Sequence, residues 1–531
     1  MTVSKIKDVV ISKRMLYSLC FFLLMIIDWT RGSQVGSTWA WTVNMTGVIM
    51  AVIVFSAYDL KSFFKPVYLV YAAVCIIALP LVYWWWNLHP SAIYRDKLLT
   101  AVVNIWLLGV LLTRLLLDVF IYKIKRLHFS KLEILIVMLL LWMSFSINED
   151  VWPIWFLVMF ELFYHTDYSE KDVEDMKQGL LNGIILGFFV LQGAAFVFRP
   201  FDDTYARYPG IYANYNINAL FYCVVLVAFL IKLCFARRNK ESKILILLYT
   251  LFSGALMGFL VLTITRTAWI AAIAVILCYI FCSEFILLRK KAKSVIASIF
   301  MMSFIMIASI PIEYVAVRYL PTVFHHPIWY EGEYSEEKVH SFDPWNSEKY
   351  VSYDEFKDAI WVRVEPYVSL ISQKLTVHAQ EIEVIDSEKV DFKTDESYSS
   401  ARGRLFIWRY FLKNGNVFGH SSADGHEIEG AGMYVWHAQN MFVQFWYYYG
   451  IPAALLLIVM LLSLIAVGIK KAICNQENAL ICVLYVALIL FYGLFEATWY
   501  PGQIILFLTF FVPKFLMTEK DSDSGKRVPI E

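Results

Sequence analysis

Three arginines in this sequence stand beside long apolar segments, where a charged side chain is costly to bury. They are Arg207 in "YARYPGIYANYNINALFY", Arg266 in "LVLTITRTAWIAAIAV" and Arg404 in "SSARGRLFIWRYFLKNGNVFGHS". A guanidinium is always charged, and its planar fork of donors matches the oxygens of a phosphate. Each arginine also has a structural interpretation: a surface turn for Arg207, a hairpin turn reaching the lipid headgroups for Arg266, and a charged surface helix for Arg404. The functional alternative is a site for an anionic substrate.

A single histidine, His437, precedes the apolar segment that begins in "VWHAQNMFVQFWYYYGIPAALLL". A neutral imidazole can accept a proton near pH 7, and arginines nearby would keep the ring uncharged. The alternative is a hydrogen-bonding residue without a chemical role, which is the more common use of a lone histidine. We therefore take His437, Arg266 and Arg404 as the candidates for catalysis.

Further polar residues around these positions are candidates for substrate binding. Arg404 and Trp408 are four residues apart, so they share one face of a helix. The expected binding set consists of Arg207, Asn214, Asn216, Arg402, Trp408 and Asn440.

The chain lacks the common motifs for metal ions, nucleotides and serine hydrolysis. Residues 420 to 437 include His420, Asp424, His426, Glu427 and Glu429, but they have neither the HExxH nor a cysteine-based spacing. No GxxxxGK(S/T) loop, no GxGxxG after a strand and no GxSxG elbow occurs. The formal net charge of +1 gives no basic field for a nucleic acid. We expect no metal and no cofactor at the active site, and no nucleic-acid partner.

The composition indicates an all-α membrane protein that crosses the bilayer many times. Of the 531 residues, 59% are hydrophobic and 17% aromatic, well above an ordinary soluble domain. A span needs about 20 mostly apolar residues, and on that criterion roughly fourteen candidates occur, with 12 to 14 helices expected. They lie near 15–29, 40–58, 66–86, 98–121, 132–147, 151–166, 178–198, 216–235, 243–263, 268–288, 295–312, 439–468, 479–497 and 502–517.

Basic residues concentrate in alternate loops, which predicts the orientation of the chain. Residues 236–243 ("ARRNKESK") and 289–294 ("RKKAKS") are the strongest examples. Both termini are then cytoplasmic, and the long polar segment before the last three spans lies outside. Helical spacing within 352–375 predicts amphipathic helices there. The expected organisation is helices 1 to 11 over 1–312, a large extracytoplasmic loop over 313–438, C-terminal transmembrane helices over 439–517, and a cytoplasmic tail over 518–531.

Four motifs in this order resemble the bacterial superfamily of O-antigen ligases and O-antigen polymerases, which are integral membrane glycosyltransferases. The motifs are "RYPGIYANYNINAL", "TITRTAWIAA", "ARGRLFIWRYFLKNGNVFGHS" and "HAQNMFVQFWYYYGIPAALLL". The resemblance covers residues 200 to 460 of the chain. The resemblance implies a helical fold of the GT-C type, polyprenyl-pyrophosphate-linked glycan donors, and no metal or nucleotide at the active site. It matches Arg207, Arg266 and Arg404 with the outer arginines of the family, and His437 with its functional histidine.

The function that follows is polymerisation of undecaprenyl-pyrophosphate-linked oligosaccharide repeats of O-antigen, capsule or exopolysaccharide. Transfer would invert the anomeric centre and take place on the outer face of a bacterial cytoplasmic membrane. The expected partners are the glycan donor, a glycan acceptor and the lipid bilayer, with a flippase and a chain-length regulator as further proteins. A ligase that moves glycan to lipid A core or to a protein is the first alternative. A lipid-linked glycan transporter is the second.

Overall fold

The computed structural model describes a helical membrane protein. The residues that it describes are 12–32, 39–70, 73–74, 77, 98–123, 125, 127–148, 152–199, 201, 206–324, 328, 351–376, 401–421, 426–428, 433–435, 437–497, 499 and 502–517. Most of the expected span at 66–86 and all of the tail at 518–531 lie outside these residues.

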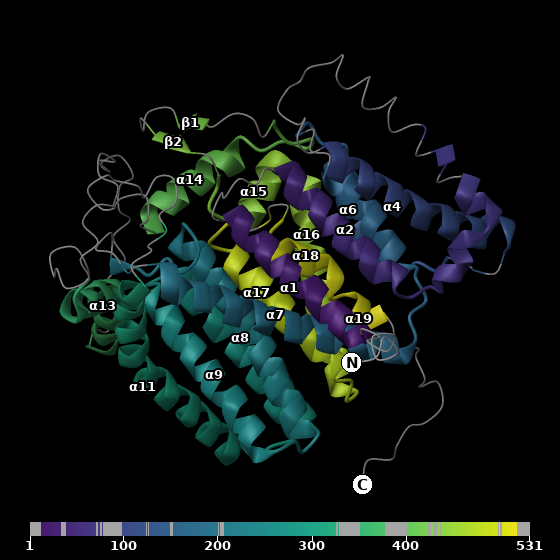
Figure 1. The fold of residues 1–531 in the computed structure, drawn as a ribbon. Coiled ribbons are helices and arrows are strands. Elements are labelled where there is room, and N and C mark those ends of the chain that lie inside the picture. Colours follow the sequence, from purple (N-terminus) through teal and green to yellow (C-terminus); the bar gives the residue numbers. More distant parts are fainter. Residues whose placement is uncertain are drawn as a thin grey trace, which may run out of the picture.

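Helices form nearly all of the regular structure (Figure 1). In the first half of the chain they are α1 (Lys13–Gly32), α2 (Trp39–Phe55), η2 (Leu60–Phe64), α4 (Leu98–Leu116), η4 (Leu117–Ile121), α5 (Lys131–Ser144), α6 (Trp152–Tyr164), α7 (Glu170–Phe198), α8 (Tyr215–Arg238) and α9 (Lys243–Leu262). The second half adds α10 (Arg266–Tyr279), η6 (Ile280–Leu287), α11 (Ala292–Phe324), α13 (Tyr353–Thr376), α14 (Ala401–Lys413), α15 (Met441–Tyr448), α16 (Ile451–Ile473), α17 (Asn478–Gly493), α18 (Ile504–Phe511) and α19 (Lys514–Met517). A short antiparallel hairpin joins β1 (His426–Ile428) to β2 (Met433–Val435).

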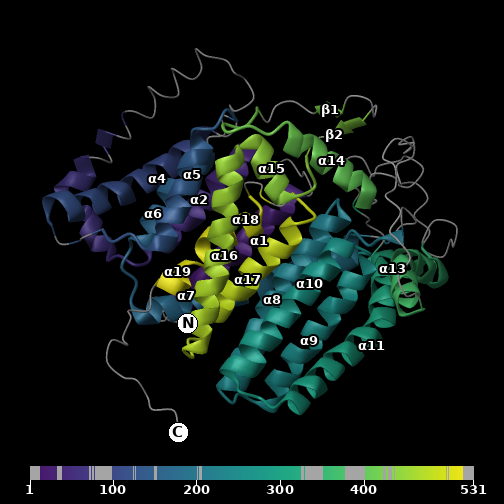
Figure 2. The same cartoon turned by 180° about the vertical axis from the view of Figure 1, so that it is seen from behind.

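Two helices, α8 and α17, lie in the interior of the bundle. α8 packs against α7, α9 and α10, and α17 packs against α8, α10 and α16. α9 and α11 lie beside each other on one side, whereas α2, α4, α5 and α6 gather on the other (Figures 1 and 2). Nearly every residue of α17 and most of α8 are buried, so these helices are apolar all round rather than on one face.

A stripe of glycines lets α1 lie directly against α7. Gly179, Gly183 and Gly187 recur at every fourth residue of α7, so they share one face. A Cβ added at Gly179 would lie 2.4 Å from the Cβ of Tyr17, and one at Gly187 would lie 2.7 Å from that of Met25. Small residues at this spacing allow close approach of helices in membranes. This contact fixes the N-terminal helix on the bundle.

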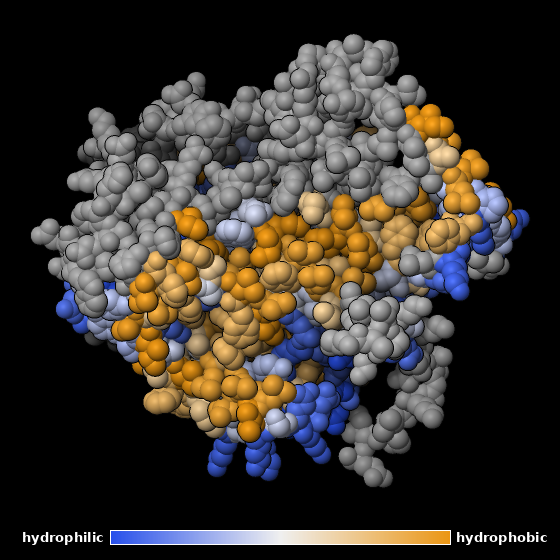
Figure 3. All heavy atoms as spheres, viewed as in Figure 1, coloured by the Kyte–Doolittle hydropathy of each residue, from blue (hydrophilic) through white to orange (hydrophobic). Residues whose placement is uncertain are grey.

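Six helical segments among the described residues are long and apolar enough to cross a membrane. They are Glu170–Phe198, Tyr215–Arg238, Lys243–Leu262, Arg266–Leu287, Ala292–Pro321 and Ile451–Ile473. The surface in Figure 3 carries a broad band of hydrophobic residues with hydrophilic residues below it. Such a band is the surface that lipid chains cover. The chain is therefore an all-α, multi-pass membrane protein.

The two ends of the bundle have different polar residues. At one end, Arg238 donates to the carbonyl of Asn475 at 3.2 Å, and Lys177 pairs with Glu477 at 3.1 Å. We call this the basic end, because the connections 236–243, 289–293 and 470–477 meet there. The start of α1 is at the same end, where Lys13 pairs with Asp172. The opposite end, the site end, carries α14, α15, the connections 206–214 and 263–266, and residues 494–497 and 502–503.

Several predicted boundaries differ from the structure, among them the start of α7, which is Glu170 and not 178. The span expected at 439–468 is two helices, α15 and α16, because the backbone turns at Gly450 with φ of 90°. A Cβ at Gly450 would lie 2.0 Å from the carbonyl oxygen of Val417, so this turn requires glycine. The helix expected to end at 312 continues to Phe324 in α11, in spite of prolines at 311 and 321.

Candidate functional site

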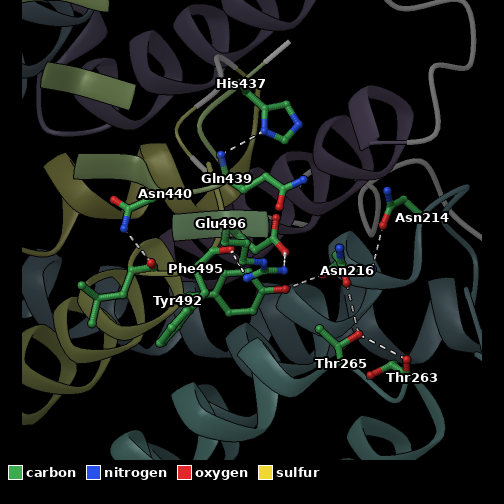
Figure 4. A network of polar contacts seen from close by, with 12 residues as sticks. Asn214, Asn216, Thr263, Thr265, His437, Gln439, Asn440, Tyr492, Phe495 and Glu496 are labelled. Atoms are coloured by element: carbon green, nitrogen blue, oxygen red, sulfur yellow. Dashed lines mark hydrogen bonds and ion pairs between the residues drawn. The ribbon is translucent and has the colours of Figure 1, made fainter. Parts of the chain in front are cut away.

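The four residues singled out in the sequence lie at the site end. Arg207 belongs to the connection between α7 and α8, and Arg266 is the first residue of α10. Arg404 lies in α14, and His437 lies shortly before α15. Figure 4 shows the polar network at this end, in which side chains from four separate segments converge. Residues as far apart in the chain as Asn216 and Tyr492, 276 positions, are therefore brought together by the return of successive helices to one end.

Arg207 is held by three hydrogen bonds and one aromatic ring. Its Nε donates to the carbonyl of Thr263 at 3.1 Å, and its Nη2 donates to Asn216 Oδ1 at 3.2 Å and to Thr265 Oγ1 at 3.1 Å. The guanidinium carbon lies 3.3 Å from the ring centroid of Tyr215. Burial lowers the pKa of Arg207 to about 10, so the side chain stays charged at neutral pH.

The N-terminus of α10 lies next to this arginine and has no side-chain cap. Thr265 is the N-cap residue, but its hydroxyl contacts Arg207 and Asn216 and does not bond the first turn. Arg266 follows directly and is partly buried. N–H groups in the first turn of a helix attract anions. Arg207, Arg266 and this helix end together make the connection 263–266 strongly electropositive.

Arg404 reaches across from α14 to the end of α17. Its Nη1 donates to the carbonyl of Phe495 at 2.8 Å, and its Nη2 lies 3.5 Å from Oε1 of Glu496. The Arg404 Nε is buried and has no hydrogen-bond partner among the described residues. One donor of this guanidinium therefore has no partner in the described part of the chain.

Glu496 is a residue that the sequence analysis missed. Its side chain is 14% exposed, and burial raises its pKa to about 7, although Arg404 and then Arg207 oppose the shift. The carboxyl group therefore lies within the field of both arginines. The one sequence signal was an acidic residue directly after an apolar run, in "YGLFEATWY". A carboxyl group with a pKa near neutrality is a recognised mark of functional sites.

The end of α17 also joins the first motif. Tyr492 donates its hydroxyl to the backbone carbonyl of Asn216 at 2.6 Å (Figure 4). The side-chain oxygen of Asn216 accepts the hydrogen bond from Arg207. Asn216 therefore connects α17 to the arginine-bearing connection.

His437 is partly buried, and its environment keeps the ring neutral. Burial, followed by the charge of Arg404, lowers the pKa of His437 below its usual value. Its Nδ1 accepts a hydrogen bond from the backbone N–H of Gln439 at 3.3 Å. A neutral imidazole has a single ring lone pair, so in this arrangement Nε2 carries the hydrogen and donates. A role as proton acceptor requires the Gln439 contact to open or the tautomer to change.

Two asparagines expected to bind substrate serve as helix caps. Asn440 accepts from the N–H groups of Phe442 and Val443 at the start of α15, and it donates to the carbonyl of Leu494 at 2.7 Å. Asn214 accepts from the N–H of Asn216 at the start of α8. Asparagine is a strong N-cap residue, so both positions have a structural use. Asn440 nevertheless ties the segment of His437 to the end of α17.

The remaining members of the binding set belong to α14. Trp408 packs against the core, and its indole nitrogen is buried without a hydrogen-bond partner in the part of the chain that the structure describes. Arg402 lies in the first turn of α14, and its side chain is outside the described residues. Of the ligand-rich stretch, His420 stacks on Tyr447 with ring centroids 4.0 Å apart. That histidine fixes the loop before β1.

Strained backbone occurs beside three of the site residues. Ala206, Ile264 and Gln439 have φ of 49°, 47° and 49° without being glycine. Ile264 lies just after the end of α9, a place where a positive φ is common. A β-branched residue such as isoleucine is nevertheless rare in this conformation. Residues held in this region are concentrated at functional sites in proteins. Ala206 and Ile264 directly precede Arg207 and Thr265, and Gln439 lies two residues after His437.

No family model, curated protein or solved structure matches this chain. The geometry of the site and the order of its motifs therefore carry the functional argument.

Proposed function

We propose that the chain is a glycosyltransferase that polymerises undecaprenyl-pyrophosphate-linked oligosaccharide repeats on the outer face of the cytoplasmic membrane. The observation that carries this proposal is the meeting of Arg207, Arg404 and Glu496 beside the uncapped start of α10, where Arg266 lies. The order of the four motifs supplies the resemblance to O-antigen polymerases and ligases. A GT-C-type arrangement of 12 to 14 spans is part of the same proposal.

A pyrophosphate donor explains why several arginines, which are always charged, lie at the site end. The donor already contains an activated leaving group, so the protein has to bind two phosphates and stabilise charge on the leaving oxygen. Guanidinium groups do this with paired donors and a charge that persists at all physiological pH values. The first-turn N–H groups of α10 add donors that need no metal ion. Arg207 would chiefly hold the donor, and Arg266 and Arg404 would act on the leaving group.

In the transfer step, the acceptor hydroxyl oxygen forms a bond to the anomeric carbon of the donor. The bond from that carbon to the pyrophosphate oxygen breaks, and its electron pair leaves with the polyprenyl pyrophosphate. The hydroxyl proton passes to a base, and direct displacement inverts the anomeric configuration. A base with a suitable pKa contributes about 10² to 10⁴ in rate.

Two groups at the site are suited to accept that proton. The resemblance favours His437, whose lowered pKa makes it neutral at pH 7. Glu496 is the alternative, because its pKa of about 7 lies near the working pH. We assign the role to His437, with the Gln439 contact opening on substrate binding, and the variants described in the Discussion separate the two groups.

The ligase alternative uses the same donor chemistry and differs only in its acceptor. The transporter alternative predicts paired half-repeats with broken helices. The sequence instead has one large polar insertion near its C-terminus and no counterpart in the first half. This difference favours the glycosyltransferase over the transporter.

The test uses the purified full chain in lipid nanodiscs with a polyprenyl-pyrophosphate oligosaccharide, without nucleotide and without added metal ion. Longer lipid-linked glycans are expected, and an Arg266→Ala variant that purifies like the parent is the control. Product that forms only with lipid A core or a protein acceptor assigns the ligase function instead. Absence of any transfer from such donors, across several oligosaccharides, overturns the proposal.

A further inference from the structure

A second cluster of ionisable side chains lies away from the site end, between α5 and α6. Nε2 of His165 is 2.9 Å from Oε1 of Glu133 and 3.3 Å from Oε2 of Glu161. One ligand atom from each residue lies within 4.8 Å of the other two. Glu133 is 3% exposed and His165 is 8% exposed, so two of the three residues are buried.

The three side chains are close enough to pair as ions, but their contacts do not have the geometry of well-aligned hydrogen bonds. Although Nε2 of His165 is close to both carboxylates, neither oxygen lies in line with it for an N–H···O bond, and it has no hydrogen-bond partner among the described residues. Oε1 of Glu133 and Oε1 of Glu161 are also buried without such partners. Buried polar atoms of this kind are rare, and a bound ion is one physical cause of them. One possible ligand atom from each of the three side chains therefore lies in the same small region.

The neighbouring structure fixes the cluster in place. The other carboxylate oxygen of Glu133, Oε2, accepts the backbone N–H of Ser130 at 3.0 Å as part of the capping box of α5. The ring of Phe129 packs edge-on against His165, with centroids 4.9 Å apart. Metal ligands are typically oriented by such contacts to their remaining atoms.

We propose that Glu133, Glu161 and His165 bind one divalent transition-metal ion. One imidazole nitrogen with two carboxylate oxygens is a ligand set for Zn²⁺, Mn²⁺ or Fe²⁺. With metal–ligand bonds of about 2.1 Å, neighbouring ligand atoms lie about 3.0 Å apart in octahedral and about 3.4 Å apart in tetrahedral geometry. The separations of 2.9 and 3.3 Å from the imidazole nitrogen agree with these values. Three protein ligands leave at least one position for water.

The ion would have a structural role, because the cluster is remote from the arginines. α5 and α6 contact the site-end loops at their other ends, through Ile147 to Phe418 and Trp152 to Tyr449. Glu133 lies near the start of α5, a helix of 14 residues that is about 20 Å long. The ion would join the start of α5 to the end of α6 and balance the charge of the two carboxylates.

The experiment measures metal binding by the purified full chain after treatment with EDTA and its removal. Zn²⁺ and Mn²⁺ are added separately, bound metal is counted by mass spectrometry, and the thermal unfolding midpoint is recorded in detergent. One tightly bound ion per chain and a raised midpoint are expected. Visible absorption of bound Co²⁺ provides a further readout of nitrogen and oxygen ligands.

Three variants distinguish a bound metal ion from an ion pair among the same side chains. Glu161→Gln alters the most exposed ligand, so the fold is least at risk, and the affinity is expected to fall by more than about 10-fold. His165→Gln should behave likewise. Asp167→Asn, at the same end but outside the cluster, should bind as the parent does. The proposal is overturned if the parent binds no ion and its unfolding midpoint does not change on addition of metal. In that case a protonated His165 is simply paired with both carboxylates. The proposal is also overturned if Glu161→Gln binds the ion as tightly as the parent.

Discussion

The carboxyl group of Glu496 lies 3.5 Å from Nη2 of Arg404, which joins the end of α17 to α14. The pair is part of a longer connection, because Arg207 also acts on Glu496 and is itself bonded to Asn216 and Thr265. A bound pyrophosphate would compete with this carboxyl group for the guanidinium donors. Under the proposed function, Glu496 would help to hold Arg404 in place before the donor binds.

Burial of Glu496 makes the stability of the protein depend on pH. Its pKa rises from 4.5 to about 7 on folding. A carboxyl group with a raised pKa contributes stability that is complete below pH 4.5 and is lost as the pH rises through about 7. The loss corresponds to about 3 kcal/mol, at 1.36 kcal/mol per pKa unit. Thermal unfolding in detergent from pH 4.5 to 8 should show this decrease in the parent. Glu496→Gln should be less sensitive to pH, and equal slopes in the two proteins would refute the buried, uncharged state.

Variants of His437 and Glu496 identify the proton acceptor. If His437 is the base, His437→Ala and His437→Gln should both lose about 10² to 10⁴ in turnover while donor binding remains. If the ring acts only as a donor through Nε2, His437→Gln should retain activity, because its amide N–H can replace that donor. If Glu496 is the base, Glu496→Gln should show the large loss instead. Each variant must insert and purify like the parent before its turnover is compared.

The arginines should differ in their tolerance of lysine. Arg266 follows a tight connection at the start of α10, so Arg266→Lys should fail because a point charge cannot replace a planar fork. Arg404 lies on α14, outside the bundle core, so Arg404→Lys should keep partial turnover and Arg404→Ala should not. Arg207→Ala should chiefly weaken binding of the donor, and it should also lower the unfolding midpoint because three hydrogen bonds are lost. Equal activity of the Arg266→Lys variant and the parent would rule out the paired-donor role.

The turn at Gly450 should resist substitution. With φ of 90° and ψ of 165°, the residue occupies a region that costs other residues about 1 to 3 kcal/mol. A Cβ would in addition collide with the carbonyl of Val417. Gly450→Ala should lower the unfolding midpoint clearly. Gly193→Ala is the matched control, since a Cβ at Gly193 meets nothing within 4 Å, and a similar loss in both variants would contradict the steric explanation.

The orientation proposed from the basic loops can be tested by labelling. In a cysteine-free background, a cysteine at Ser352 should react with a membrane-impermeant maleimide in intact cells or spheroplasts. A cysteine at Ser242, in the basic connection between α8 and α9, should react only after lysis. Reaction at Ser242 in intact cells would place the arginines on the cytoplasmic side and remove the basis for an outer-face enzyme.

The sequence was sufficient for the helices that are continuous apolar runs. The spans expected at 216–235 and 243–263 correspond to α8 and α9 within a few residues, because length and hydropathy alone determine such helices. The split between α15 and α16 could not be read in the same way. It depends on the approach of Val417 to Gly450, which is a tertiary contact.

Within the site, residue type alone left two questions open. An asparagine before a helix is equally suited to cap it and to bind a ligand, and only the contacts of Asn214 and Asn440 reveal their use as caps. Glu496 was overlooked because the charges that define its environment lie far away in the chain, on Arg207 and Arg404. An acidic residue between apolar segments has no partner that the sequence can identify.

The enclosure of α8 has a consequence for how the protein is made. The ribosome completes α8 long before α17, one of the helices that enclose it. During synthesis, the side of α8 that α17 covers must therefore face lipid or the insertion machinery, and it is enclosed only after α17 is inserted. Closure of the bundle is a late event in biosynthesis, and a chain that stops before α16 would leave a membrane-inserted intermediate for proteases to remove.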